Sequence, residues 1–240
     1  MLLLDVGNSR CKWARIGASG WTHRGVVDNA AWPLLQHDFA ALPPPSRIIA
    51  SNVGGEQMAQ RLRTACALWP APVEFVAARA AQCGVSNGYE DPACLGSDRW
   101  VALIAAWQRM QRACLVVNCG TATTVDALSD AGEFLGGLIL PGITLMQQSL
   151  LHNTAQLHHA AGCVQDFPRN TADAIHSGAI CATRGAIQHQ YQLLGAGDTA
   201  GCVLSGGAAG QIREHLGMPV LHVDNLVLEG LQLFGEASAC

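Results

Sequence analysis

The chain has 240 residues, half of them apolar and 13% charged, and its formal net charge is −4. This length accommodates two domains of ordinary size, and the high apolar fraction excludes a disordered chain. The most apolar stretch, residues 134–143, is too short to cross a bilayer and is interrupted by glycine and proline, so no membrane partner is expected. Only one of the 14 basic residues, Lys12, is a lysine.

The charge and cysteine patterns bear on partners and compartment. Arginines are scattered without a basic stripe, so nucleic acid is not an expected partner. The start, Met-Leu-Leu-Leu-Asp, has no basic residue and does not resemble a signal peptide. Ten cysteines lack any C-x-x-C spacing and predict free thiols in a cytoplasmic protein. His152, His158 and His159 lie close in sequence, but no cysteine or carboxylate at ligand spacing accompanies them, so no metal site is expected there.

The first half of the chain reads as strands followed by alternating helices and strands. Apolar runs and alternation predict strands over 2–6, 11–16, 21–27, 47–53 and 73–77. Helical spacing of apolar residues predicts one helix through 58–69. It predicts a second through 100–107, with Ser97 or Asp98 as its N-cap.

The second half repeats this order. Strands are predicted over 115–119, 123–128, 133–140, 202–205 and 220–223, and helices over 144–151, 171–194, 211–216 and 226–234. Residues 2–9 and 115–122 align without a gap at an offset of 113, and each segment opens a strand and a glycine-containing hairpin. We therefore expect a duplicated α/β chain with domains over 1–112 and 113–240 and a cleft between them.

The first hairpin carries the chemistry of a phosphate site. A buried strand ends in Asp5, and Gly7, Asn8 and Ser9 form the turn that follows it. Successive backbone N–H groups of such a turn can bind an anion, and a carboxylate can hold hydrated Mg²⁺. Lys12 adds a compact positive charge within reach of a phosphate. The alternative is that this hairpin and the similar one at residues 120–124 are both ordinary β-hairpins.

The second half offers two weaker signals for nucleotide. The segment 120–124, Gly-Thr-Ala-Thr-Thr, repeats the hairpin with hydroxyls and no cation. The small residues of 205–209, Ser-Gly-Gly-Ala-Ala, follow a strand and would let an adenosine ring lie against the backbone. Gly-Gly after a strand is also common in plain turns.

Taken in order, these motifs resemble those of type III pantothenate kinases, members of the actin/Hsp70/sugar-kinase superfamily. Residues 5–12 resemble the family's D-x-G-N-[ST]-x-x-K motif, residues 96–99 its G-x-D-R motif, and residues 120–126 its second phosphate motif. Phe167-Pro168, Asn170-Thr171, Ala174 and Gly178 match a later segment. Residues 204–207 match the adenosine-side turn, and 224–231 a segment near the end.

The resemblance implies a fold, a reaction and a set of residue roles. The fold is a pair of ribonuclease H-like (actin-like ATPase) domains with a central nucleotide cleft. The reaction is ATP-dependent phosphorylation of pantothenate to 4′-phosphopantothenate, the first step of coenzyme A biosynthesis. The family's catalytic base aligns with Asp98. Residues implied in ATP binding are Asp5, Val6, Gly7, Asn8, Ser9, Arg10, Cys11, Lys12, Thr121, Gly206 and Gly207. Those implied in pantothenate binding are Tyr89, Gly96, Ser97, Asp98, Arg99 and Thr171, in a pocket that the family completes across a homodimer interface.

One position departs from the family pattern. The second phosphate motif usually begins with an aspartate that takes part in binding a monovalent cation, K⁺ or NH₄⁺, and this chain has Asn118. Asparagine keeps a carbonyl oxygen but no charge, so weaker cation binding is expected. The implied cofactors are therefore ATP, Mg²⁺ held by Asp5 either directly or through water, and a monovalent cation near Asn118.

Two other functions fit parts of the same pattern. One is a kinase of this superfamily that acts on another small alcohol. The other is a non-catalytic regulator that binds nucleotide or a protein partner; the replacement at Asn118 leaves room for it, while Asp5, Lys12 and Asp98 together argue against it. Tyr89, Ser97 and Thr171 could also serve structure alone, as a packing tyrosine and as helix caps.

Overall fold

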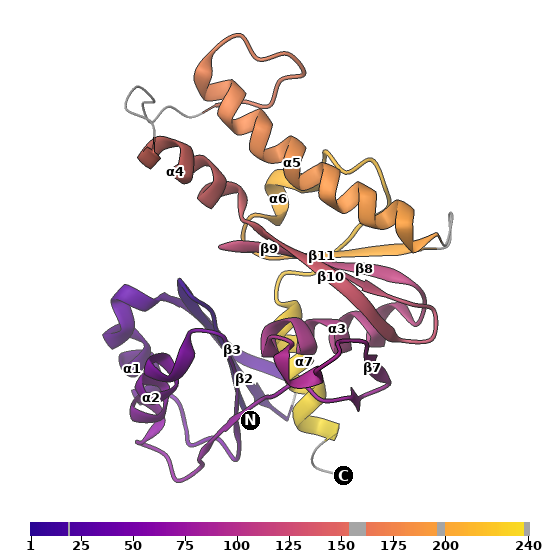
Figure 1. The fold of residues 1–240 in the computed structure, drawn as a ribbon. Helices are drawn as coiled ribbons and strands as arrows, with labels where there is room; N and C mark the ends of the chain where they lie inside the picture. Colours follow the sequence, from indigo (N-terminus) through magenta and orange to yellow (C-terminus); the bar gives the residue numbers. More distant parts are fainter. Residues whose placement is uncertain (19, 154–161, 196–199, 238–240) are drawn as a thin grey trace. The chain divides into compact units, whose positions relative to one another are not determined.

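The computed structural model describes residues 1–18, 20–153, 162–195 and 200–237. It divides into two compact units, residues 1–105 with 226–240, and residues 106–225. Each unit is an α/β body built on one sheet (Figure 1). No helix in the described part of the chain is long and apolar enough to cross a membrane.

The first unit is built on a five-stranded sheet with the order β3-β2-β1-β4-β5. β1 is antiparallel to β2 and parallel to β4. The strands are β1 (Leu2–Val6), β2 (Arg10–Gly17), β3 (Gly20–Asp28), β4 (Ile48–Asn52) and β5 (Val73–Phe75), with a small hairpin of β6 (Ala81–Gln82) and β7 (Val85–Asn87). The helices are α1 (Trp32–Ala40), α2 (Gly55–Cys66), most of α3 (Ser97–Met110) and α7 (Leu226–Ala237), with short 3₁₀ turns at Asn29–Ala31 and Pro92–Cys94.

The two faces of this first sheet bury different partners. Leu2, Leu4 and Val6 point to one face and pack with residues of α1 and α2 in a single apolar cluster. The alternate residues of the same strands point to the other face, where Ile49 lies against Gly235 of α7. Alternation therefore places Asp5, which lies between Leu4 and Val6, on the α7 side of the sheet.

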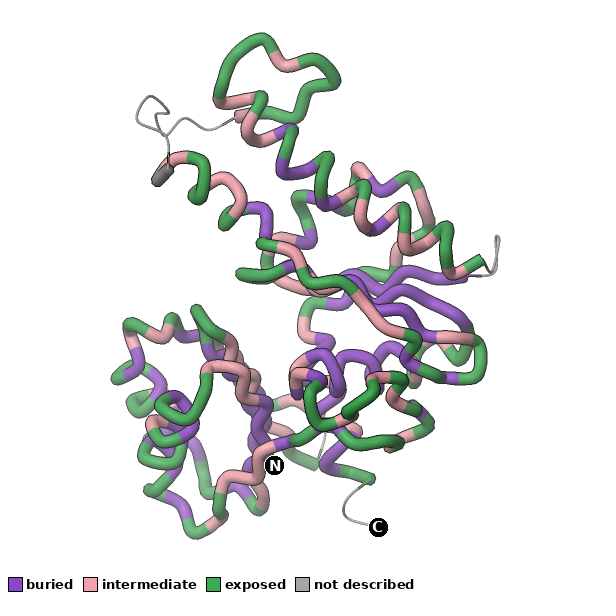
Figure 2. Tube along the Cα trace, in the orientation of Figure 1, coloured by how far each residue is buried: buried purple, intermediate pink, exposed green. Residues whose placement is uncertain are grey.

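The second unit repeats the strand order of the first. Its strands pair in the order β12-β11-β8-β9-β10, with β8 antiparallel to β9 and parallel to β11. The strands are β8 (Cys114–Cys119), β9 (Ala122–Leu128), β10 (Glu133–Pro141), β11 (Gly201–Ser205) and β12 (Leu221–His222). The helices are α4 (Ile143–Asn153), α5 (Thr171–Leu194) and α6 (Ala209–Arg213). The inner strands of both sheets are largely buried (Figure 2).

This repetition confirms the expected fold class of duplicated ribonuclease H-like units. The division itself differs from the expected boundary at 112/113. The last helix, α7, belongs to the first unit because it packs on β1 and β4, and the boundary falls within α3. The order of elements along the chain cannot reveal which sheet a helix packs on, since an amphipathic helix can pack on either one.

Most predicted elements are present, and α1 and the β6–β7 hairpin are additions. α1 starts without a side-chain cap, so its only start signal is the proline in its first turn, which a loop can also carry. The nine described cysteines are free thiols, as the absence of C-x-x-C spacing predicted. His158 and His159 lie outside the described residues.

Candidate active site

The first predicted site residues form a row across three strands. Asp5 of β1 lies directly opposite Lys12 of β2 and beside Ser51 of β4. Directly opposed residues of paired strands point to the same face, so a carboxylate, an ammonium and a hydroxyl share one face of the sheet. Asp5 and Lys12 are both half-buried, whereas Ser51 is fully buried.

The turn after Asp5 is held by a residue that the sequence did not single out. The Gly7 N–H donates to the Arg10 carbonyl at 3.0 Å, which closes the turn. Asn29 follows β3, and its side-chain amide donates to the carbonyls of Gly7 and Asn8, both at 2.9 Å. These carbonyls are therefore drawn toward Asn29. A lone asparagine after a strand gives no sequence signal for this role.

Glycine at position 7 is not required by the turn alone. A Cβ placed there would meet the Arg10 carbonyl oxygen at 3.4 Å, an ordinary contact distance. Asn8 and Ser9, which follow it, are exposed. The protein's own atoms therefore do not crowd the turn around Gly7.

The side chains of Val6, Cys11 and Arg10 in the first motif are engaged within the protein. The side chains of Val6 and Cys11 are fully buried in the apolar cluster beneath the sheet. Arg10 pairs with Asp28 at 2.8 Å on the exposed surface. Val6 and Cys11 can therefore reach a nucleotide only through their backbone, and they serve the core with their side chains.

The G-x-D-R segment forms the start of α3. The Trp100 N–H donates to the Gly96 carbonyl at 3.0 Å. This is the first helical bond, so Gly96 holds the N-cap position, and the expectation of Ser97 or Asp98 there is wrong. A Cβ on Gly96 would lie 2.8 Å from Asp98 Oδ1, so a larger residue here would force the Asp98 carboxylate to move. The Asp98 carboxylate accepts the Arg99 N–H at 2.8 Å.

Burial makes Asp5 and Asp98 unusual acids, and for Asp5 the Asp98 charge adds to the effect. The pKa of Asp5 is raised to about 7: burial raises it most, the neighbouring Asp98 charge also raises it, and Lys12 lowers it. Burial also raises the pKa of Asp98, against the Arg99 N–H and the Arg99 charge, which lower it. The two carboxyls therefore lie close enough to interact, and they hold protons more strongly than exposed carboxyls do.

Tyr89 and Arg99 meet beside this pair. Arg99 is buried, and its guanidinium donates to the Tyr89 hydroxyl at 2.8 Å. The Asn87 side chain fixes the loop that carries Tyr89, because its amide oxygen accepts the Tyr89 N–H at 3.1 Å. The structure thus brings together Asp98, Arg99 and Tyr89, which the sequence grouped as substrate-side residues.

The second hairpin is one residue shorter than the first. Asn118 lies opposite Thr124, whereas its counterpart Asp5 lies opposite Lys12, seven positions along the chain. Thr124 is therefore the structural counterpart of Lys12. Asn118 is half-buried and Thr121 is exposed at the turn. The duplicated hairpin has lost both charges of the first.

The remaining predicted residues also lie in the second unit. Gly206 has φ +100° and packs on the Cys119 backbone. A Cβ on this residue would lie 2.3 Å from the Cys119 carbonyl oxygen, so packing alone demands a glycine here. Gly207 is exposed, and a Cβ there would meet nothing within 4 Å. Thr171 is the exposed first residue of α5, and Asn170 caps the helix by accepting the Asp173 N–H at 2.9 Å.

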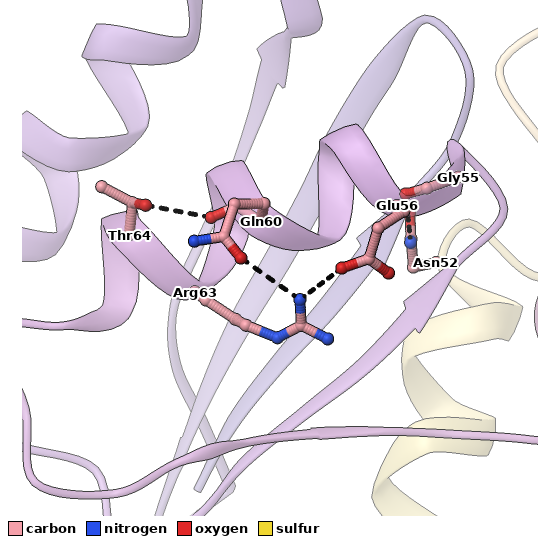
Figure 3. Close-up of polar contacts among 6 residues, drawn as sticks. All are labelled: Asn52, Gly55, Glu56, Gln60, Arg63 and Thr64. Atoms are coloured by element: carbon pink, nitrogen blue, oxygen red, sulfur yellow. Dashed lines mark hydrogen bonds and ion pairs between the residues drawn. The ribbon is translucent and has the colours of Figure 1, made fainter.

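A groove of about 560 Å³ between α1 and α2 contains none of these residues. Trp32 lines it, with the Arg61 guanidinium 5.1 Å from its ring. Figure 3 shows that the polar side chains along α2 satisfy one another: Arg63 donates to Glu56 at 2.7 Å and to Gln60 at 3.4 Å. This arrangement suits an exposed helix surface, and we assign the groove no role in the reaction.

Within the described residues, no three acidic, histidine or cysteine side chains are grouped to hold a metal ion. Asp5, the acid that the sequence predicted for Mg²⁺, would therefore supply at most part of a metal's ligands. That donor set still fits Mg²⁺, which usually keeps several waters and takes one or two carboxylates together with substrate phosphates.

Known proteins similar to this chain in sequence or fold identify its family. The family model for type III pantothenate kinase covers residues 1–193. The type III pantothenate kinase of Aromatoleum aromaticum is 46% identical over 100% of this chain and 99% of its own length. That of Nitrosospira multiformis is 45% identical over 96% and 89%. A crystal structure from Campylobacter jejuni, assigned to the Baf family of transcriptional activators, shares the fold with a TM-score of 0.66 at 20% identity, over the whole of both chains. The chain belongs to the type III pantothenate kinase family.

Proposed function

We propose that this chain transfers the γ-phosphate of ATP to the primary hydroxyl of pantothenate, which gives 4′-phosphopantothenate and begins coenzyme A synthesis. The observation that carries this proposal is the G-S-D-R start of α3 beside Asp5, in a chain that belongs to the family. Phosphoryl transfer needs positioned charges and one group that takes a proton. The first unit supplies both.

In this proposal Asp98 is the catalytic base. Its carboxylate accepts the proton of the pantothenate hydroxyl as that oxygen bonds to phosphorus and the bond to ADP breaks. The raised pKa supports this role, because a carboxylate that holds a proton more strongly is a better base near neutral pH. The Arg99 N–H fixes one carboxylate oxygen, which leaves the second oxygen for the substrate.

The first hairpin binds the phosphates of ATP. The backbone N–H groups of residues 7–9 and the Lys12 ammonium would contact phosphate oxygens, and Asp5 would hold Mg²⁺ through an oxygen or a bound water. When bound, Mg²⁺ neutralises charge on the phosphates. The half-buried Asp5–Lys12 pair supports this assignment, because in a partly dry site the carboxylate can hold the metal while the neighbouring ammonium contacts phosphate.

Arg99 and Tyr89 form the pantothenate side. Pantothenate carries a carboxylate and an amide, which need hydrogen-bond donors. A buried guanidinium is a suitable partner for a carboxylate, and its bond to the Tyr89 hydroxyl orients both groups. Ser97 and Thr171 complete our assignment on this side.

The second hairpin serves ATP with neutral groups. Thr121 would contact the phosphates, and Gly206 and Gly207 would lie beside the adenosine. Asn118 offers a carbonyl oxygen to K⁺ or NH₄⁺, and we expect this cation to bind weakly because the usual carboxylate is absent.

A homodimer in the cytoplasm completes the proposal. Apolar side chains stand exposed on the second unit, including Leu145 and Leu150 of α4 and Phe167, which is 90% exposed. An exposed apolar group of this kind suits a surface that a second copy covers. Thr171 follows Phe167 closely in sequence, so such a contact would lie near the pantothenate side.

A coupled ADP-release assay tests the proposed function. With ATP and Mg²⁺, addition of pantothenate should release ADP, and mass spectrometry should show phosphopantothenate. The same assay on a panel of other small alcohols is the control. ADP release with another alcohol and none with pantothenate would contradict the proposal, and ATP binding without any turnover would favour a regulator.

A further inference from the structure

Two buried hydroxyl groups join the sheet of the first unit to α3. Ser51 of β4 is fully buried and Ser97, the first residue of α3, is 8% exposed. Their Oγ atoms lie 2.8 Å apart, so one hydroxyl donates to the other. This bond links residues that are 46 positions apart in sequence.

The bond connects the two acids of the site. Ser51 lies beside Asp5 in the parallel pair of β1 and β4. Ser97 immediately precedes Asp98. A short path therefore runs from one acid across a strand pair, through two hydroxyls, to the other acid, and every part of it lies in the first unit.

The first turn of α3 also carries the Arg99–Tyr89 hydrogen bond. Its interior is anchored by apolar burial, since Trp100, Leu103 and Ile104 are all buried. Apolar packing is not directional, whereas a hydrogen bond between two buried hydroxyls fixes both distance and rotation. A buried hydroxyl that loses its partner cannot turn to water instead.

We propose that Ser51 is a positioning residue, which acts through Ser97 to aim the Asp98 carboxylate. The inference rests on the proposed function, in which Asp98 is the base. A base must lie within hydrogen-bond reach of the hydroxyl it deprotonates, and a shift near 1 Å can cost about a hundredfold in rate. A pair that served only to dock the helix would affect stability and leave the rate unchanged.

The test is a double-substitution cycle with Ser51→Ala, Ser97→Ala and both together. For each variant, kcat, KM for ATP, KM for pantothenate and Tm are measured, with assays held well below the lowest Tm. We expect Ser51→Ala to lower kcat about tenfold while KM for ATP changes less than twofold. The double variant should lose no more than the worse single variant, since the two hydroxyls act as one unit.

Thr183→Val is the matched control. Thr183 of α5 is fully buried and its hydroxyl donates to the Ala179 carbonyl at 2.9 Å, so the change removes a buried hydroxyl outside the assigned site. Its Tm should fall while kcat stays within twofold of the parent enzyme. Should Ser51→Ala fail to fold, Ser97→Ala still tests the bond through kcat, because the loss of a direct Ser97 contact with pantothenate would appear in KM for pantothenate. Alanine is well tolerated at the first position of a helix.

Asp98→Asn, run in the same assay, separates two kinds of failure. If Asp98→Asn keeps the parent rate, the proposed role of Asp98 is wrong and the role of Ser51 is wrong with it. If Asp98→Asn is inactive while both serine variants keep kcat within twofold, only the inference on Ser51 is overturned. Additive losses in the double variant, or a change confined to KM, would overturn it as well.

Discussion

Asp5 and Lys12 show how a few side chains change an ordinary hairpin into a site. They lie opposite each other on half-buried strand positions, and Asp98 adds a second carboxyl nearby. Burial, repulsion and a single ammonium together decide how many protons this group holds at neutral pH.

Lys12→Arg should lower kcat about tenfold or more. The planar guanidinium is larger than an ammonium and distributes its charge over a fork, so it cannot take the same place opposite Asp5. Steady-state ADP release measures the effect. Arg24→Lys, on the exposed part of β3, is the control in the same sheet and should leave kcat unchanged. A parent-like rate for Lys12→Arg would show that the position needs only a positive charge.

Asp5→Asn should abolish activity and stabilise the fold above neutral pH. An unfolded aspartate ionises near pH 3.8 and native Asp5 near 7, so only the native state keeps this proton between these values. The stability that this proton contributes is complete below pH 4 and is lost as pH rises through 7. At pH 8 the variant should therefore exceed the parent by about 2–4 kcal/mol.

Urea unfolding at pH 5 and pH 8 measures this difference. Asp130→Asn, at an exposed turn, is the control and should change stability little at either pH. An Asp5→Asn variant that is less stable than the parent at pH 8 would show that the native carboxylate is stabilised by its surroundings.

At the level of elements, the sequence predicted the strands well and the packing of helices poorly. Leu2–Val6 and Thr171–Leu194 agree with their predicted ranges, because apolar runs and a capped helix with a glycine after its end are local signals. The assignment of α7 to the first unit depends on contacts far apart in sequence. For the same reason the sequence identified Asp98, which belongs to a local motif, but not Asn29 and Ser51, whose hydrogen-bond partners lie on other elements.

The contact of α7 with α3 explains one glycine in the C-terminal helix. A Cβ on Gly230 would lie 1.9 Å from the Val101 carbonyl oxygen, so Gly230→Ala should destabilise the protein by about 3 kcal/mol or more. Gly185→Ala is the matched change at an exposed position of α5, where a Cβ meets nothing within 4 Å. It should stabilise the protein by about 0.5–1 kcal/mol. Thermal unfolding of both variants measures the contrast, and equal effects would contradict this packing.

At the level of the whole molecule, duplication is followed by divergence. The strand order of the first sheet recurs in the five strands of the second unit, yet the first hairpin has Asp5 and Lys12 where the shorter second hairpin has Asn118 and Thr124. Both carboxyls of the site and its ammonium therefore lie in the first unit. The second unit exposes apolar residues, which our proposal assigns to a dimer.

Phe167→Ser tests that dimer. Because Phe167 is 90% exposed, a monomer would lose little stability from the change. If a second copy covers this residue, sedimentation should show a dimer for the parent and a larger dissociation constant for the variant, with a higher KM for pantothenate. An unchanged dimer would place the interface elsewhere, and a monomeric parent would contradict the dimer.

If Asp98 is the base, the Asp98→Asn variant should keep ATP binding and lose turnover. Asparagine keeps the size of the side chain but cannot accept the hydroxyl proton. We predict that the variant binds ATP with parent affinity in calorimetry while its phosphorylation of pantothenate falls at least about a hundredfold. A turnover close to that of the parent enzyme would contradict the account.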